Sequence, residues 1–482
     1  MVMAAAVWCA FMGMAPGASR GTDAAQAVDT SEAYGTSETS GRPDVVIIVT
    51  DDQRHGTEVG MPTLMSEVAA NGVRFTRAMV PTSWCCPSRA SLLTGNFAHT
   101  TGVWENTAKV PYGAWPAFAA TGAESDTLAT RLDAAGYRTG LFGKYLNGIS
   151  AAPPQYRPPG WDVFDALLAE SHYRYRFSSE VAPPEGRREY LTDEVVRRTV
   201  DFIRSTPSDE PLLAFVAPYA PHAPLDAGPY RGAASRAGVM PAVREATHWP
   251  SPAVNQGDMS GYPAWMQGIK ASATFDKSRD LPLATALRRQ QDMLMGVDAG
   301  IERILDALET EGRLQDTLIV FVSDNGFLMG EHRLQRKHTP YDASIRVPLV
   351  MRFDGRLPAG SVDDSLAIAN VDVYSTILDL VGVDRAAVDG RSLITQDRRE
   401  GMVVEAARWR VIGRPAYCGW READFLFVRY ATGEEEAYDY AVDPHELRNV
   451  VADPAYVDRT SSARERARVA CDPVPPDFTW DP

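Results

Sequence analysis

Apolar runs recur along the chain with the spacing of strands in a buried sheet. The first, PDVVIIVTDD (43–52), is continuous and rich in β-branched residues, which is typical of a strand covered on both faces. Helical apolar periodicity precedes two later runs, around Leu128 and Leu132 and again from Met295 to Leu308. The runs are residues 43–52, 136–145, 211–224, 317–326 and 347–355. Strands that alternate with helices predict an α/β domain with helices on both faces of the sheet.

Polar side chains follow four of these runs at the point where each run ends. In open α/β sheets, ligands bind in the crevice outside the carboxyl ends of the strands. Four strands that deliver polar groups to that edge therefore predict one shared site. The residues are Asp51, Asp52, Lys144, His222, Asp324 and Asn325.

Two later segments differ from this pattern. Residues 226–285 are rich in Pro, Gly, Ala and Ser, and we interpret them as a long surface excursion and a candidate lid over the site. The pattern of apolar and polar residues changes again from about residue 386. There, DFLFVRYATGEEEAYDY (424–440) predicts an antiparallel hairpin. These features indicate a smaller C-terminal subdomain that ends in a proline-containing tail.

Composition and charge limit the class of protein. The chain has 482 residues, of which 45% are hydrophobic, and this suits one large domain with an appendage, or two domains. Its formal net charge of -15 argues against nucleic acid or an acidic membrane as a partner, so an anionic substrate would need a locally positive pocket. The sequence leaves the oligomeric state open.

The N-terminal residues predict export. Residues 1–27 hold an apolar run that is too short to span a bilayer, followed by small residues, and we interpret them as a cleaved signal peptide; the alternative is a disordered cytosolic leader. Residues 28–42 form a predicted flexible linker. Because no other stretch could cross a membrane, we expect a secreted protein without stable membrane insertion.

The cysteines do not form a zinc-binding pattern. There are five, at positions 9, 85, 86, 418 and 471, and no CxxC pair is present. Cys418 and Cys471 could form a disulfide after export or remain free thiols, and the sequence leaves both possibilities open. The adjacent pair Cys85 and Cys86 lies in TSWCCPSRASLLTG (82–95).

The segment from Cys85 to Gly95 resembles the signature of the type I sulfatases, C-x-P-S-R-x-x-x-L-T-G, and matches every fixed position. The resemblance extends over roughly residues 43–450. It implies an alkaline-phosphatase-like three-layer α/β/α core with a central mixed, mostly parallel sheet, in a catalytic domain over residues 43–385. A smaller C-terminal α+β subdomain with an antiparallel sheet would occupy residues 386–482. The implied activity is the hydrolysis of sulfate esters.

The resemblance also implies a modified nucleophile and a metal ion. Cys85 would be converted to formylglycine by a formylglycine-generating enzyme, and the hydrated aldehyde would attack sulfur. Pro87 would open a helix here, which places residue 85 near positive backbone dipoles. Hard oxygen donors suit Ca²⁺, the usual ion of the family, or less commonly Mg²⁺. The implied metal ligands are Asp51, Asp52, Cys85, Asp324 and Asn325.

Cations and one histidine complete the implied site. By resemblance, Arg89, Lys144 and Lys337 would bind sulfate oxygens and stabilise charge in the transition state. Arg336 is an adjacent competitor for the role of Lys337. His222, in APHAP, would protonate the leaving oxygen.

One position departs from the common family pattern. Many sulfatases carry a histidine two residues after the lysine at 144, as the base for sulfate elimination, and this chain has Leu146. His332, His338 or water could take that role. Together with GKYLN (143–147), the departure resembles the N-acetylglucosamine-6-sulfatase branch, related to extracellular heparan endosulfatases. This implies a 6-sulfated N-acetylglucosamine or a related sulfated glycan as the substrate.

Weaker matches supply four candidate substrate-binding residues, which are Asn147, Ser171, His99 and His332. The segment EAYDYAVDPHELRN (436–449) resembles a family element that we interpret as a structural turn docking the subdomain on the large domain. Two alternative functions remain open. One is a phosphomonoester or phosphonate monoester hydrolase of the same superfamily, and the other is a non-catalytic relative that binds sulfated glycans.

Overall fold

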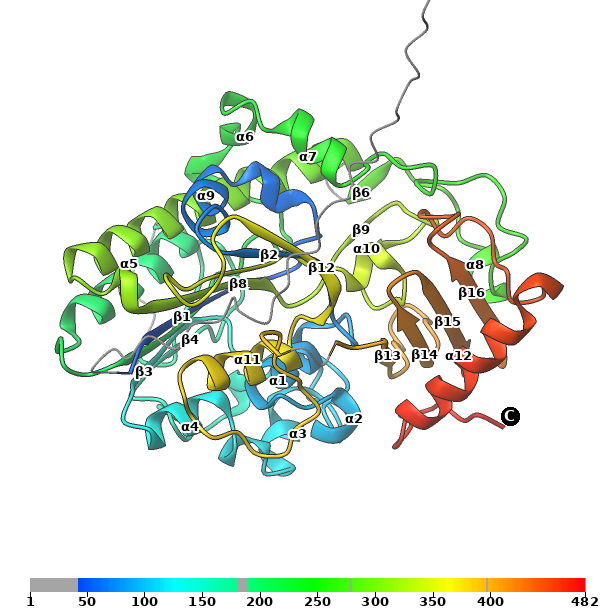
Figure 1. The fold of residues 1–482 in the computed structure, drawn as a ribbon. Helices are drawn as coiled ribbons and strands as arrows, with labels where there is room; N and C mark the ends of the chain where they lie inside the picture. The colour runs from blue at the N-terminus through cyan, green and yellow to red at the C-terminus, as the bar shows by residue number, and fades with distance from the viewer. Residues whose placement is uncertain (1–41, 181–188, 277–279, 396–397, 482) are drawn as a thin grey trace, which may run out of the picture.

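The computed structural model describes residues 42–180, 189–276, 280–395 and 398–481, which fold into a large and a small part (Figure 1). The large part has three layers, with helices on both faces of an eight-stranded sheet, and the small part carries an antiparallel sheet of its own. The predicted fold class is confirmed. The predicted signal peptide and residues 28–41 of the predicted linker lie outside the described residues.

The large sheet is mixed and mostly parallel. Its strand order is β12-β2-β11-β8-β1-β5-β3-β4, and β11 runs antiparallel to both of its neighbours while the other pairs are parallel. The strands are β1 (Asp44–Thr50), β2 (Val73–Met79), β3 (Arg138–Gly143), β4 (Val163–Ala166), β5 (Leu212–Ala217), β8 (Thr317–Ser323), β11 (Leu349–Arg352) and β12 (Ser361–Ile368).

The central strand β1 is buried along its whole length because helices cover both faces of the sheet. Val46 and Ile48 pack in the core formed with α5 (Leu191–Ser205) and α9 (Leu283–Thr310). Val45, Ile47 and Val49 point to the opposite face, as expected for the two-residue repeat of a strand. The helices on that face are α1 (Cys85–Thr94), α3 (Ala114–Ala120), α4 (Leu128–Ala134) and α11 (Val371–Leu380).

Short elements fill the connections. The predicted excursion 226–285 contains small helices that lie outside α9 and beside the C-terminal sheet (Figure 1). Its elements are α6 (Ala233–Arg236), α7 (Met240–Ala246), α8 (Ala264–Gln267), β6 (Thr274–Asp276) and β7 (Leu281–Pro282). Elsewhere lie α2 (Ala98–Thr101), β9 (Leu328–Met329), β10 (Gln335–Arg336) and α10 (Asp342–Ile345).

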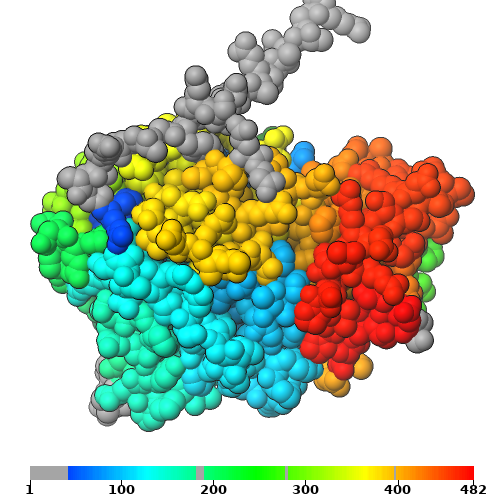
Figure 2. Space-filling model, turned by 60° about the horizontal axis from the view of Figure 1, so that its bottom comes forward, coloured from blue at the N-terminus to red at the C-terminus, as the bar shows by residue number. Residues whose placement is uncertain are grey.

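The small part is a four-stranded antiparallel sheet with one long helix against it. The strands are β13 (Gly401–Ala406), β14 (Tyr417–Glu422), β15 (Phe425–Tyr430) and β16 (Glu435–Asp439), and the helix is α12 (Val457–Ala470). The predicted hairpin over 424–440 is confirmed, because β15 pairs antiparallel with β16. Cys418 of β14 and Cys471, just after α12, form a disulfide. In the space-filling view this part forms a lobe directly against the large part (Figure 2).

Buried polar contacts join the two parts. Glu436 of β16 accepts hydrogen bonds from the hydroxyls of Tyr341, Tyr430 and Tyr438, at 2.5 to 3.1 Å. Glu446 accepts a hydrogen bond from the backbone N–H of Asp342 at 2.9 Å. The segment 436–449 therefore docks the small sheet on the large part, as the sequence predicts, and it does so on the residues that follow Lys337.

Candidate active site

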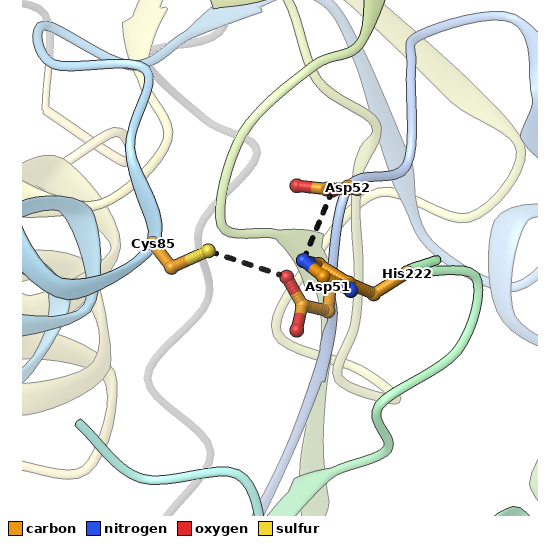
Figure 3. Close-up of side chains that lie close together, drawn as sticks. All are labelled: Asp51, Asp52, Cys85 and His222. Atoms are coloured by element: carbon orange, nitrogen blue, oxygen red, sulfur yellow. Dashed lines mark hydrogen bonds and ion pairs between the residues drawn. The ribbon is translucent and has the colours of Figure 1, made fainter. Parts of the chain in front are cut away.

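The predicted polar residues meet at one edge of the sheet. Strands β8, β1, β5 and β3 are consecutive neighbours, and all four run in the same direction. Their carboxyl ends therefore lie side by side, and the first turn of α1 faces them. In Figure 3 the side chains of Asp51, Asp52, Cys85 and His222 converge from a strand end, a helix and a loop. One ligand atom from each of these four residues lies within 4.8 Å of the others.

The signature segment is helix α1, and its sequence accounts for both ends. Trp84 is the extended N-cap residue, and Pro87 lies in the first turn, where its missing N–H costs no hydrogen bond. Gly95 ends the helix in the left-handed region, with φ 71°, and a Cβ there would come within 2.4 Å of the ring of Tyr374. The motif thus holds Cys85 on the first turn of a fully buried helix.

The two adjacent cysteines have different surroundings. Cys85 Sγ lies 2.6 Å from Lys337 Nζ and 3.5 Å from Asp51 Oδ1. Burial, together with the charge of Asp51, raises the pKa of Cys85 to about 12, so its thiol is neutral at physiological pH. Cys86 packs in the apolar core beneath the sheet, and its backbone N–H donates to Asn106 Oδ1 at 2.8 Å.

Three buried carboxylates pair with three buried cations around residue 85. The pairs are Asp51 with Lys144 (2.6 Å), Asp324 with Arg89 (2.8 Å) and Asp52 with Lys337. Burial opposes the ionisation of Asp51, but the charges of Lys144, His222 and Lys337 outweigh it and hold the pKa of Asp51 well below its ordinary value. The formal charges of the three carboxylates and the three cations sum to zero.

Oxygens of three of the residues predicted to bind a metal surround one ammonium group. Lys337 Nζ bonds to Asp52 and lies 3.1 Å from Asn325 Oδ1 and 3.9 Å from Asp51 Oδ1. Asn325 Nδ2 in turn donates to Asp52 Oδ1 at 2.7 Å, and the backbone N–H of Asp52 donates to Asp324 Oδ1 at 3.2 Å. A positive charge is thus already accommodated among carboxylate and amide oxygens, the donor set that Ca²⁺ and Mg²⁺ prefer.

His222 presents one ring nitrogen to this cluster. Its Nδ1 lies 2.5 Å from the carbonyl oxygen of Ala223 and must donate to it, which leaves Nε2 as the ring nitrogen that faces the cluster. Nε2 lies 3.6 Å from Asp52 Oδ2. His172 Nε2 donates to the carbonyl oxygen of His222 at 3.2 Å and helps to hold the loop.

The other candidate residues lie apart from the cluster. Ser171 Oγ accepts a hydrogen bond from the backbone N–H of Arg174 and closes a turn, and Asn147 Nδ2 donates to Glu170. His99 pairs with Glu405 of β13. Within the described residues, neither these three nor His332 lines the cavity that contains Asp52, His222 and Lys337.

The histidines considered for the missing base are also held elsewhere. His332 lies 3.3 Å from Glu446 and 3.2 Å from the hydroxyl of Tyr262, in the joint between the two parts. The buried ring of His338 lies 4.1 Å from that of Trp84, and burial holds the pKa of His338 well below its ordinary value. Leu146, at the position of the usual family histidine, packs in the apolar core and supplies no base to residue 85.

A cavity of about 170 Å³ opens onto the cluster. It is lined by Asp52, His222 and Lys337, and by Arg336, which the sequence offers as a competitor of Lys337. The remaining lining residues were missed by sequence reasoning and are Trp84, Asn106, Ala223, Phe275, Phe327 and Trp409. Trp84 could have been suspected because it precedes the signature. Trp409 and Phe275 come from the small sheet and the excursion, and no local pattern marks them.

Two protein-family models match this chain. The model of the family "Sulfatase" matches residues 43–383, and that of "N-sulphoglucosamine sulphohydrolase, C-terminal" matches residues 330–469. The chain belongs to the sulfatase family. The N-acetylglucosamine-6-sulfatase of Homo sapiens is 30% identical over 376 residues, which cover 73% of this chain and 64% of that protein. The extracellular sulfatase SULF-1 homolog of Drosophila melanogaster is 31% identical over 73% of this chain but only 31% of that protein.

Solved structures share the sulfatase fold. A protein solved with its substrate D-glucosamine-2-N,6-O-disulfate superposes with a TM-score of 0.74, at 22% identity, over 90% of this chain and 99% of that chain. The phosphonate monoester hydrolase of Agrobacterium radiobacter superposes with a TM-score of 0.66, at 23% identity, over 89% of this chain and 95% of that chain. At these identities the likeness concerns the fold alone.

The His99–Glu405 pair of this sulfatase-family chain predicts a pH-dependent stability. Burial lowers the pKa of His99, but the hydrogen bond and charge of Glu405, 2.8 Å away, outweigh it and raise the pKa above 6.5. Because the folded-state pKa is the higher one, the pair stabilises fully below the unfolded pKa, and this stabilisation is lost as pH rises through the folded value.

The test compares melting temperatures of the wild type and His99→Gln between about pH 6 and pH 9. We expect the difference to be largest at the acidic end and to shrink as the pH rises. His248→Gln, at an exposed histidine, is the matched control and should show no such trend. A difference for His99→Gln that is constant with pH would contradict the prediction.

Proposed function

We propose that this chain is an exported, calcium-dependent sulfuric ester hydrolase whose nucleophile is a formylglycine made from Cys85. The observation that carries the proposal is the position of residue 85. It lies on the first turn of α1, in contact with Lys337 and Asp51, among three carboxylates and three cations. We assign the catalytic domain to residues 43–385 and the supporting subdomain to residues 386–482.

The charge of the site supports an anionic substrate. The three carboxylates and three cations cancel, so a divalent ion would leave the cluster with two positive charges in a chain whose formal net charge is -15. In buried surroundings such a charge attracts a sulfate ester and stabilises the negative charge that develops in the transition state.

The residues present fit the metal that the family implies. Asp51, Asp52, Asp324 and Asn325 would hold Ca²⁺ by hard oxygens, and Mg²⁺ is the less suitable ion. When bound, the ion supplies Lewis-acid polarisation of the sulfuryl group and lowers the pKa of the nucleophile. Cys85 would be its ligand only after conversion, because a neutral thiol is a poor ligand for a hard cation.

The chain's own cations position the reacting group. Arg89 donates from Nε to Asp324 and from Nη1 to the carbonyl oxygen of Lys144 at 2.8 Å, while its buried Nη2 has no hydrogen-bond partner among the described residues. That spare donor is available to residue 85 or to a sulfate oxygen. Lys144 and Lys337 would bind further sulfate oxygens. His222 Nε2, the ring nitrogen that faces the cluster, would hold the proton given to the leaving oxygen.

Several observations support the substrate class and the compartment. The human relative is named an N-acetylglucosamine-6-sulfatase, and we infer a 6-sulfated N-acetylglucosamine or related glycan as the substrate. The chain spans 31% to 64% of the length of the extracellular and human relatives, so their whole activities are not carried over. The Cys418–Cys471 disulfide favours an oxidising compartment, and no helix among the described residues is long and apolar enough to cross a membrane.

The second candidate function is phosphonate or phosphate monoester hydrolysis. It is favoured by the shared fold of the phosphonate monoester hydrolase. Phosphate and sulfate esters have similar shapes, and fixed cations attract both.

The test is a turnover screen of the protein co-expressed with a formylglycine-generating enzyme. We expect kcat/KM for 4-nitrophenyl sulfate to exceed that for 4-nitrophenyl phosphate and a matched phosphonate ester by about 10²-fold or more, equivalent to roughly 3 kcal/mol. N-acetylglucosamine 6-sulfate should also be hydrolysed. A reversed preference would establish the second function, and binding of sulfated sugars without any turnover would establish a non-catalytic relative.

A further inference from the structure

The mouth of the cavity is built from aromatic rings on two sides. Trp409, in the loop after β13, and Phe275, in β6, are partly exposed, and each is backed by a buried ring. The centroid of Trp409 lies 4.2 Å from that of Trp84, with the rings nearly perpendicular, and the centroid of Phe275 lies 5.8 Å from that of Phe327. We call these four residues the aromatic wall. Such rings bind the apolar face of a sugar or another ring.

Both sides of the wall are tied to the segment that carries the catalytic lysine. Trp409 and Arg414 exchange backbone hydrogen bonds at 3.0 and 3.2 Å, which closes a tight loop. The buried guanidinium of Arg414 then donates to the carbonyl oxygens of Lys337 and, at 3.0 Å, of Gln335. On the other side, Gln335 Nε2 donates to the carbonyl oxygen of Thr274, next to Phe275, at 2.9 Å. These hydrogen bonds therefore fix the position of the aromatic wall relative to Lys337.

Arg336 lies at the same mouth and has no acidic partner within the described parts of the chain. Its neighbour Lys337 is buried against residue 85, whereas Arg336 is exposed and lines the cavity. Its backbone has φ 75°, a region in which a non-glycine residue is strained. Of these two adjacent cations, Lys337 contacts residue 85 and Arg336 lines the entrance.

We propose that the leaving group of the substrate is a ring that stacks on the aromatic wall and carries a second anionic group, a sulfate or a carboxylate, which pairs with Arg336. This inference rests on the proposed sulfatase function and narrows its substrate class. A cavity of about 170 Å³ has the volume of roughly six water molecules, which suits one ring beside the scissile ester.

The charge balance of the chain favours a second anionic group on the substrate. With a net charge of -15, most of the surface repels a substrate that carries several anionic groups. An unpaired guanidinium at the entrance offsets that repulsion locally, and its planar fork can bind a sulfate or carboxylate through two hydrogen bonds. A neutral ring would use the wall and leave Arg336 without a partner.

The experiment compares Arg336→Gln with the wild type on three substrates that share a 6-sulfate. N-acetylglucosamine 6-sulfate has no second anion, D-glucosamine-2-N,6-O-disulfate has a second sulfate, and a 6-sulfated N-acetylglucosamine linked to a uronic acid has a carboxylate. We expect kcat/KM to fall about 10- to 100-fold on one or both of the doubly charged substrates, mainly through KM, and less than about 3-fold on the first. The substrate that responds identifies the anion.

Matched variants separate charge from structure. Arg336→Lys should restore part of the lost kcat/KM, and Arg408→Gln, at an exposed arginine outside the cavity lining, should behave as the wild type. Trp409→Ala should lower kcat/KM on all three substrates by about 10-fold, while Trp409→Phe should retain most of it.

A binding measurement tests the inference apart from turnover. Calorimetric titration of the three compounds into Cys85→Ser protein, with and without Arg336→Gln, should show an affinity loss confined to the doubly charged compounds. Equal losses of kcat/KM or affinity on all three compounds, or no loss on any, would overturn the inference. If the converted wild type hydrolyses no sulfate ester at all, the proposed sulfatase function itself is wrong.

Discussion

Cys85→Ala is expected to abolish turnover of sulfate esters, by about 10⁴-fold or more, because the variant has no precursor of the nucleophile. Cys86→Ala should retain most of the activity. Cys86 packs in the apolar core, and its backbone N–H donates to Asn106, a contact that the substitution leaves in place. Its expected cost is a loss of stability of about 1 kcal/mol, from a slightly smaller buried side chain.

The measurement combines kinetics with mass spectrometry of the peptide that contains residue 85. Conversion of the thiol to an aldehyde lowers the mass of that peptide by about 18 Da. The shift should be present in the wild type and in Cys86→Ala, and both variants should give native circular dichroism. Equal inactivation of the two variants would point to chemistry of a thiol pair. A fully active wild type with an unmodified thiol would refute the formylglycine.

The strands predicted from the sequence are those whose environment leaves a simple signal. β1 and β8 are buried on both faces and read as continuous apolar runs, so they were found together with the helices before β3 and β8. The prediction missed β2, β4 and β12. β12 begins as SVDDS with exposed and half-buried residues, because it lies at the edge of the sheet. β2 carries two half-buried arginines, Arg74 and Arg77, which interrupt the apolar run that marks a buried strand.

The site was predictable where the chain delivers residues at strand ends, and less so where distant segments converge. The structure brings together Asp51, Asp52, Cys85 and His222, as strand order and motif indicated, whereas His332 is held by Glu446. Histidines and serines are common in loops, and only tertiary contacts show which face a cavity. For the same reason Trp409 and Phe275 of the aromatic wall could not be foreseen.

Removal of the divalent ion by a chelator is expected to abolish activity while the protein stays folded. We expect a loss of kcat of about 10³-fold or more, since the proposed ion would supply charge stabilisation at the sulfuryl group. The fold should survive because each of the three carboxylates has a cationic partner of its own, and the ammonium of Lys337 bonds to Asp52 among the proposed ligand oxygens. Added Ca²⁺ should restore the activity fully.

Substitution of Lys337 tests whether the paired cations keep the protein folded without the ion. In Lys337→Ala, chelation would leave the buried carboxylate of Asp52 without its cation, at a cost on the order of 3 kcal/mol. Melting temperatures measured with and without chelator should therefore fall much further on chelation in Lys337→Ala than in the wild type. Lys109→Ala, at an exposed lysine, is the control and should match the wild type. If the chelated wild type unfolds as readily as Lys337→Ala, the paired carboxylates do not hold the site together, and the ion is a structural requirement as well as a catalytic one.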